Sequence, residues 1–333
     1  MDKNYILDIE NLSVEYRTEF GAVKALNQIE LKVEKGKTLG LVGETGAGKT
    51  TVGLSILRLI PSPPGKITSG TIMFDGEDLQ EKTEAEMEKI RGEKISMIFQ
   101  DPMTALNPVF RVQDQIAESI LLHEDISKED ASKKAGDMLE LVGIPRERGK
   151  EYPHQFSGGM KQRVVIAIAL ACSPTLLIAD EPTTALDVTI QAQVLDIIKK
   201  LREKYQTSML MITHDLGVVA EVCDEVSVVY AGSVVEHGTL EDVFNNTRHR
   251  YTEGLFNSLP NLEHREKMLK PIRGMMPDPS NLPEGCAFCE RCDYATEICK
   301  KQKPEKHYRN DTHYVCCHLY DECGAGERRL ERN

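Results

Sequence analysis

The sequence predicts an α/β fold built around a mainly parallel sheet, and three observations carry that prediction. Short apolar runs rich in Val, Ile and Leu alternate over residues 1–245 with longer segments of helical period. Four of these runs show no alternation of polar and apolar residues, as expected for strands that are buried on both faces. The length of 333 residues and the hydrophobic content of 40% suit one large globular core with an appendage.

The strands differ in pattern along the chain. The early segments 7–16 (LDIENLSVEY) and 29–36 (IELKVEKG) do alternate, so we expect them to form an N-terminal antiparallel β subdomain. The buried strands of the parallel sheet are predicted at residues 38–43, 94–100, 175–181 and 208–215.

Two further regions depart from this pattern. Residues 110–172 carry no comparable strand, and we expect a helical insertion over about residues 103–172. A Pro- and Gly-rich linker at 271–285 precedes a Cys-rich tail. We therefore predict a main domain over residues 1–250 and a small appendage over 251–333.

Charge and composition exclude several classes of protein. A formal net charge of −12 argues against a basic surface that grips nucleic acid. The N-terminus lacks the basic and apolar regions of a secretory signal, and the longest apolar run, at 164–172, is half of what a bilayer span requires. Nine cysteines without such a signal argue against a framework of disulfides.

The segment GETGAGKT (43–50) fits the pattern G-x-x-x-x-G-K-[ST] and lies between a predicted buried strand and a predicted helix. Its glycines allow backbone N–H groups to point at phosphate oxygens, and the following helix adds its positive end. Lys49 can reach the β- and γ-phosphates, and Thr50 can offer its hydroxyl to Mg²⁺. The sequence therefore predicts a P-loop NTPase core.

A carboxylate site for the metal is predicted at the end of the run LLIADEP, where the apolar residues give way to Asp180 and Glu181. Asp180 would hold the Mg²⁺ shell, and Glu181 can polarise a water for in-line attack on the γ-phosphate. An acidic pair at the end of a strand is common in proteins. The assignment of Asp180 and Glu181 to the metal site therefore depends on the phosphate loop predicted at residues 43–50.

Between these motifs stands FSGGMKQR (156–163), in which a serine hydroxyl and two glycine amides at a helix start would form another anion site. With this motif 23 residues before the metal carboxylate, the sequence resembles the ATPase subunits of ABC transporters, whose signature is usually L-S-G-G-Q. The resemblance implies that two such subunits pack head to tail. It implies that Ser157, Gly158, Gly159 and Met160 of one subunit act on ATP held by its partner.

The resemblance assigns further roles in the same chain order. Tyr16 matches the aromatic residue that stacks on adenine, and Gln100 matches the glutamine that touches Mg²⁺ and the attacking water. Asp187 matches a residue that crosses the dimer interface, and His214 matches the switch histidine near the γ-phosphate. The implied catalytic residues are Glu181, His214 and Gln100, with Mg²⁺ held through Thr50, Gln100 and Asp180. The implied ATP-binding residues are Tyr16, Gly43, Glu44, Thr45, Gly46, Ala47, Gly48, Lys49, Thr50 and Thr51.

The segments FQDPMTALNPV (99–109) and HRYTEGL (249–255), with the Cys-rich tail, resemble the oligopeptide/dipeptide-importer branch of that family. One departure is Arg250, which stands where the branch usually has proline. The resemblance implies that ATP-driven dimer closure powers peptide import. Nickel or sugar import and a non-transport ABC ATPase are the alternatives.

The branch also implies partners and a place in the cell. The partners would be two transmembrane permease subunits, a second ATPase subunit (a paralogue favoured over a second copy) and, indirectly, an extracytoplasmic peptide-binding protein. The chain would lie peripherally at the cytoplasmic face of the membrane.

The tail contains Cys286, Cys289, Cys292, Cys299, Cys316, Cys317 and Cys323. Spacing alone favours C-x2-C-x2-C (286–292), which resembles the opening of ferredoxin cluster motifs, while zinc suits four thiolates equally well. The importer branch instead has C-x-F-x-x-R-C, a further Cys, and a late Cys followed by His-Leu. That resemblance implies a [4Fe–4S] cluster on Cys286, Cys292, Cys299 and Cys317, with zinc as the alternative occupant.

Overall fold

The computed structural model describes residues 4–19, 21–184, 186–258 and 271–321. The chain divides into two compact units, each made of segments that are distant in sequence. The first unit comprises Met1–Asp8, Lys32–Thr38 and Met73–Thr213. The second comprises Ile9–Leu31, Leu39–Ile72 and His214–Asn333.

In the first unit, three parallel strands lie in the order β6 (Ile95–Ile98), β7 (Leu176–Asp180) and β8 (Ser208–Thr213). Every residue of these strands is buried, which explains why their sequences lack alternation. The register pairs Ile98 with Ala179 and Asp180 with Ile212, so the carboxyl ends of all three strands meet at one edge.

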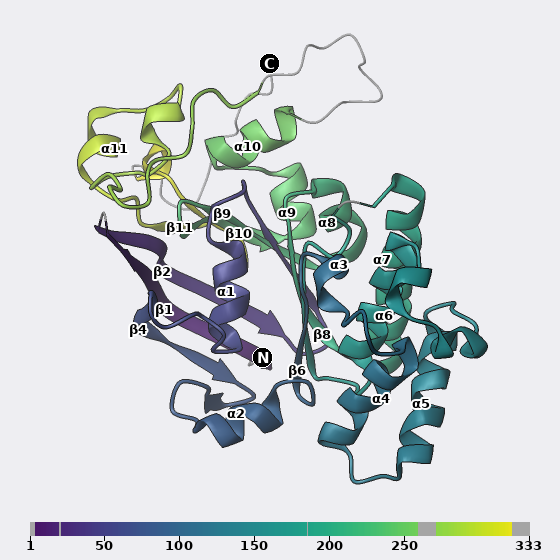
Figure 1. Cartoon of the computed structure of the whole chain (residues 1–333). Helices are drawn as coiled ribbons and strands as arrows, with labels where there is room; N and C mark the ends of the chain where they lie inside the picture. The colour runs from purple at the N-terminus through teal and green to yellow at the C-terminus, as the bar shows by residue number, and fades with distance from the viewer. Residues whose placement is uncertain (1–3, 20, 185, 259–270, 322–333) are drawn as a thin grey trace. The chain divides into compact units, whose positions relative to one another are not determined.

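The predicted helical insertion is confirmed in the same unit. It contains α3 (Pro102–Ala105), α4 (Val112–His123), α5 (Lys128–Leu141) and α6 (Gly158–Leu170), with 3-10 turns at Arg146–Lys150 and Pro153–Gln155. The helices α4 and α5 pack side by side (Figure 1). Their buried faces follow the helical period, with Val112, Ile116 and Ile120 on α4 and Ala131, Ala135 and Leu139 on α5. The next helix, α7 (Val188–Tyr205), follows β7 in the chain and packs on α6.

In the second unit, five strands lie side by side in the order β3 (Thr38–Val42), β9 (Glu225–Tyr230), β10 (Ser233–Thr239), β12 (Tyr314–Cys316) and β11 (Lys306–Tyr308). The pair β3–β9 is parallel and the remaining pairs are antiparallel. Strand β12 joins through the register Glu236 to Val315 and His237 to Tyr314. The Cys-rich tail therefore extends the same sheet that carries β3.

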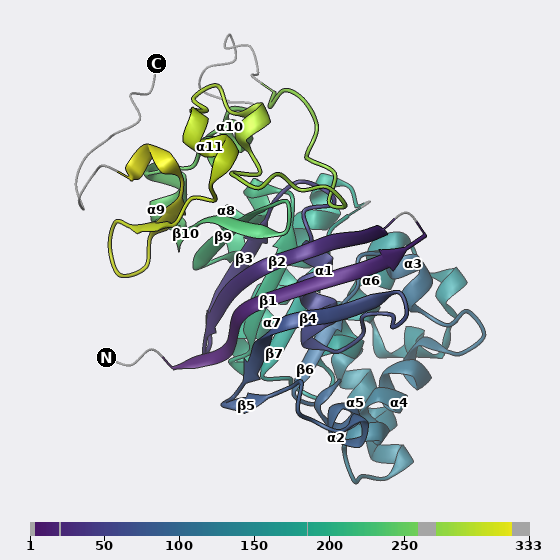
Figure 2. The same ribbon diagram turned by 90° about the vertical axis from the view of Figure 1, so that its left-hand side faces the viewer.

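The N-terminal strands form a separate sheet in the order β2-β1-β4-β5. Figure 2 shows the long strands β2 (Gly21–Glu34), β1 (Tyr5–Thr18) and β4 (Gly65–Phe74) beside one another; β5 (Glu77–Asp78) pairs antiparallel with β4. On β2, Ile29, Leu31 and Val33 are buried while the residues between them are partly exposed. This is the alternation that predicted the strand.

The remaining helices are short. They are α1 (Lys49–Ile56), α2 (Glu84–Ile90), α8 (Leu216–Val222), α9 (Leu240–Asn245), α10 (Arg250–Asn257) and α11 (Glu297–Lys301), with 3-10 turns at Cys289–Arg291 and His318–Tyr320. Within the described ranges, no helix has the length and apolar character that a membrane crossing needs. The α/β class is as predicted, and the antiparallel pairs of β9, β10, β12 and β11 add to the parallel strands that the sequence predicted. The domain boundary near residue 250 stays a prediction.

Candidate nucleotide site and cysteine pocket

The loop 43–48 connects β3 to α1, as the motif predicts. Glycine is required at two of its positions. A Cβ at Gly43 would lie 2.2 Å from the carbonyl oxygen of Val229 on β9. Gly48 has a φ of 98°, and a Cβ there would lie 2.5 Å from the carbonyl oxygen of Ala25. The loop is therefore pressed against backbone on two sides.

Lys49 folds back over this loop. Its side chain is buried, and its Nζ donates hydrogen bonds to the carbonyl oxygens of Gly43 (2.8 Å) and Glu44 (3.0 Å). The helix α1 begins at Lys49, and its N-cap residue, Gly48, has no side chain that could cap the first N–H groups. Thr45, Gly46 and Thr50 are exposed, Ala47 is buried, and Thr51 is half-buried. The loop presents amides, a hydroxyl and a lysine to a phosphate-sized anion.

Glu44 joins the loop to other parts of the second unit, a feature that the sequence did not predict. Its backbone N–H donates to the hydroxyl of Tyr251 (2.9 Å). Its carboxylate accepts two hydrogen bonds from the guanidinium of Arg291, at 2.9 and 3.0 Å. Arg291 belongs to the motif that resembles the importer branch, but nothing in the sequence indicates its partner 247 residues away.

The predicted carboxylates lie at the strand edge of the first unit. Asp180 ends β7 and is buried, and Glu181 follows it with a φ of 46°, a left-handed conformation that is uncommon for a residue with a side chain. The Oε2 atom of Glu181 accepts hydrogen bonds from Gln100 Nε2 and Thr184 Oγ1, both at 2.9 Å. The structure thus brings two of the three predicted catalytic residues together and adds Thr184.

The predicted signature segment begins α6, as expected. Ser157 caps the helix by accepting a hydrogen bond from the N–H of Met160 (3.4 Å). Ser157 and Gly158 are exposed, whereas Gly159 faces α7, where an added Cβ would lie 2.5 Å from Ile190 Cγ2. Gln162, buried on the same helix, donates to the carbonyl oxygen of Pro182 (2.6 Å). The signature helix therefore contacts the segment that follows the carboxylates.

Three predicted residues lie at the ends or edges of elements. Asp187 is exposed and caps α7 by accepting from the N–H of Ile190 (3.0 Å). His214 is exposed and directly follows the last residue of β8. Tyr16 is half-buried on β1, with its ring against Gly65, where a Cβ would lie 2.9 Å away.

The tail forms a small pocket lined by cysteines. It holds all four sulfurs of the predicted cluster set together with Cys289, whereas Cys316 lies on β12 and Cys323 lies outside the described residues. Arg250 also lines the pocket, where its guanidinium lies over the ring of Tyr294 (3.6 Å to the centroid). It occupies the first position of α10, a position that suits proline, so the departure from the branch pattern leaves the helix start intact.

Backbone amides point at the predicted sulfurs. Cys286, Cys292 and Cys317 each accept a hydrogen bond from the N–H two residues later, and Cys299 accepts one from Thr296 (3.5 Å). Burial raises the pKa of Cys286 to about 12 and that of Cys317 to about 11. For Cys289, burial and the neighbouring Cys299 raise the pKa, with no hydrogen bond among the causes. In the part of the chain that the structure describes, no three His, Cys, Asp or Glu side chains are arranged to hold a metal ion.

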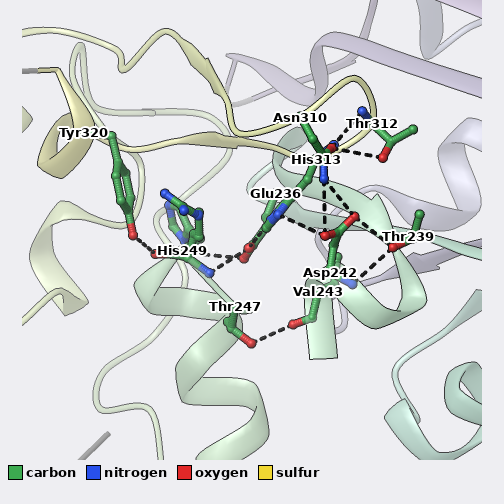
Figure 3. A network of polar contacts seen from close by, with 11 residues as sticks. Glu236, Thr239, Asp242, Val243, Thr247, His249, Asn310, Thr312, His313 and Tyr320 are labelled. Carbon is green, nitrogen blue, oxygen red and sulfur yellow. Dashed lines mark hydrogen bonds and ion pairs between the residues drawn. The ribbon is translucent and has the colours of Figure 1, made fainter. Parts of the chain in front are cut away.

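A buried polar network attaches the tail to β10 (Figure 3). Glu236, fully buried on β10, accepts hydrogen bonds from the N–H groups of Arg248 (2.7 Å) and His249 (3.0 Å). Its Oε1 also lies 3.1 Å from Nε2 of His313, which is likewise fully buried. Because a buried carboxylate needs such partners, this network fixes the start of α10 and the approach to β12.

Comparison with known proteins identifies the family. Residues 26–184 match the family model "ABC transporter", and residues 235–299 match "Oligopeptide/dipeptide transporter, C-terminal region". The oligopeptide transport ATP-binding protein OppD of Bacillus subtilis (strain 168) is 51% identical over 313 residues, which cover 93% of this chain and 87% of that protein. The chain belongs to the ABC transporter ATPases.

Other relatives of this ABC ATPase show the same family and fold. The dipeptide transport ATP-binding protein DppD of the same organism is 49% identical over 319 residues, covering 95% of each chain. Among solved structures, the ATP-binding cassette MJ0796, in a dimeric post-hydrolysis state bound to ADP and Pi, superposes with a TM-score of 0.64 at 27% identity. That match covers 70% of this chain and 98% of the cassette. The predicted family, its α/β fold and its activity as an ATP hydrolase are thereby confirmed.

Proposed function

We propose that this ABC ATPase powers the import of di- and oligopeptides through a membrane transporter. The observation that carries the proposal is the 51% identity to a relative named for oligopeptide transport, over 93% of the chain. The match of residues 235–299 to the C-terminal model of the oligopeptide/dipeptide transporters supports the same substrate class over nickel, sugars or a non-transport role.

In this proposal, the phosphate loop binds the nucleotide. Lys49 exchanges its bonds to the carbonyls of Gly43 and Glu44 for the β- and γ-phosphates of ATP, and the exposed loop amides bind the remaining oxygens. Thr50, Gln100 and Asp180 have the oxygen ligands that Mg²⁺ prefers, and the metal would neutralise charge on the phosphates. Tyr16 provides the ring on which adenine stacks.

Hydrolysis is assigned to Glu181 and its neighbours. The carboxylate of Glu181 orients and polarises the attacking water, and its bonds to Gln100 and Thr184 hold it in one rotamer. His214 contributes an imidazole near the γ-phosphate. Holding Glu181 in place before substrate binds lowers the reorganisation needed in the transition state.

The signature residues complete the site of a second ATPase subunit, for which we favour a paralogue. Ser157 and Gly158 are exposed, as groups that act on a partner's nucleotide must be, and Asp187 is exposed at the start of α7. ATP bound between two subunits favours the closed dimer, and hydrolysis removes that preference. Two permease subunits would couple closure of the dimer to transport. A peptide-binding protein would act outside the membrane, and this chain would lie at the cytoplasmic face of the membrane.

The tail is proposed to hold a [4Fe–4S] cluster on Cys286, Cys292, Cys299 and Cys317. Support comes from the shared pocket and from the amide hydrogen bonds to these four sulfurs, which are the bonds that stabilise thiolates on a cluster. A single zinc ion requires all its thiolates at about 2.3 Å from one point. Zinc on the same four thiolates is the alternative occupant. Bound iron and sulfide would tie the tail's segments together.

The test of the function is Glu181→Gln in the full chain with its co-purified partners. This change keeps the side chain's size and its hydrogen bonds but removes the charge that polarises water. We expect ATP turnover to fall by about 100-fold or more while ATP stays bound. Turnover near that of the wild type would overturn the catalytic assignment.

A further inference from the structure

The Cys-rich tail contacts the phosphate loop through one side chain. Two nitrogens of Arg291 bind the two carboxylate oxygens of Glu44, the second residue of the GETGAGKT loop. This is the fork geometry in which a guanidinium matches a carboxylate best. The Arg291 side chain is 6% exposed and that of Glu44 is 30% exposed, so water screens the pair only in part.

Arg291 is held in place by two further groups of the second unit. Its Nε donates to the carbonyl oxygen of Arg273 (3.0 Å), and a terminal nitrogen donates to the hydroxyl of Tyr230 (3.2 Å). A guanidinium stays protonated at any physiological pH. Arg291 is therefore a fixed positive charge at the loop.

The position of Arg291 depends on the cysteine pocket. Arg291 ends the 3-10 turn Cys289–Arg291 and immediately precedes Cys292, whose sulfur lines the pocket. Phe288, which starts this turn, packs between Tyr230 and Tyr251, with ring centroids at 5.3 and 5.5 Å. Tyr251 in turn binds the N–H of Glu44. The same short segment thus carries a predicted ligand, Cys292, and the side chain that pairs with Glu44, and its Phe288 packs on Tyr251, which binds the loop from α10.

A carboxylate in a loop that binds phosphates weakens nucleotide binding unless its negative charge is neutralised. An uncompensated Glu44 would repel the nucleotide's negative charge at close range. We infer that Arg291 is a positioning residue for nucleotide binding: it neutralises Glu44 and fixes the phosphate loop, so that the folded cysteine pocket sets the affinity for ATP. The inference rests on the proposed role of residues 43–50 and adds the tail as a control on that site.

The experiment measures the dissociation constant of Mg-ATP for the full-length chain by titration calorimetry. We expect Arg291→Met to weaken ATP binding about tenfold and Arg291→Lys, which keeps the charge but loses the fork, to have a smaller effect. The double variant Arg291→Met with Glu44→Gln should regain most of that affinity, because the uncompensated charge is gone. A purely structural role for Arg291 would not produce this rescue.

Lys306→Met is the matched control. Lys306 forms another ion pair between the tail and the rest of the second unit, with Glu30 of β2, away from the phosphate loop. We expect the ATP affinity of the Lys306→Met variant to equal that of the wild type. Wild-type affinity in Arg291→Met, or a double variant as weak as Arg291→Met, would overturn the inference. Lys49→Ala separates the two claims: if this change leaves ATP binding intact, the loop assignment fails instead.

Discussion

Lys49 shows how a single side chain prepares the phosphate loop before nucleotide arrives. Buried and bonded to two loop carbonyls, its ammonium already lies inside the turn that the glycines create. We expect Lys49→Ala to lower ATP turnover by about 100-fold or more, since the charge that binds the β- and γ-phosphates is lost. ATPase assays of the purified complex check this, and a loss below about threefold would contradict it.

Residue-level predictions from sequence succeed where a motif fixes both residue type and surroundings. The glycines at 43 and 48 are needed for close backbone approach and a positive φ, which the motif implies. The left-handed φ of Glu181 and the Arg291–Glu44 pair could not be predicted. Both features depend on which residues the tertiary fold places in contact. For the ion pair, many other charged residues of the chain were equally plausible partners.

At the scale of elements, the contact between α6 and α7 links the signature segment to the helix capped by Asp187. Gly159 faces Ile190 so closely that Gly159→Ala would force the two helices apart. We expect that change to lower the free energy of unfolding by about 1–3 kcal/mol, measured by denaturant unfolding of the full chain.

Gly158→Ala is the control for this prediction. Its Cβ would meet nothing within 4 Å, although it adjoins Gly159 in the same helical turn. The control should leave unfolding unchanged within about 0.5 kcal/mol. Equal destabilisation by both changes would show that the α6–α7 contact is not responsible.

In the cysteine pocket, hydrogen bonding separates the proposed ligand Cys292 from Cys289. Cys292 accepts a backbone N–H, whereas Cys289 in the same pocket is influenced chiefly by burial and Cys299. We expect Cys292→Ser to remove most iron and sulfide from anaerobically purified protein and Cys289→Ser to retain them. Zinc without iron in the wild type, or iron loss in Cys289→Ser alone, would contradict the proposed cluster.

Elements differ in how well the sequence predicts them. The buried strands β3, β6, β7 and β8 were predicted because unbroken apolar runs leave few alternatives. Strands β11 and β12 were not, since three residues give too little pattern and their pairing with β10 depends on a contact distant in sequence. Within the tail, Phe288, Tyr314 and Tyr320 are buried, which the cysteine pattern did not predict.

At the scale of the whole molecule, family membership and site geometry both bear on the function of this chain. The family matches show an ABC transport ATPase, and the described geometry supports roles for the loop, the carboxylates and the signature helix. Neither half of an ABC site turns over alone if Ser157–Met160 act on a partner's nucleotide. The roles assigned to these residues must therefore together explain transport by the assembled complex.

Peptide uptake by that complex tests the central claim most directly. The complex would be purified through a tag on this chain, reconstituted in proteoliposomes and supplied with ATP on the side of the ATPase and labelled oligopeptide on the other. We predict uptake that requires ATP and falls at least tenfold with Glu181→Gln. Uptake that proceeds without ATP, or at the wild-type rate in Glu181→Gln, would contradict the account.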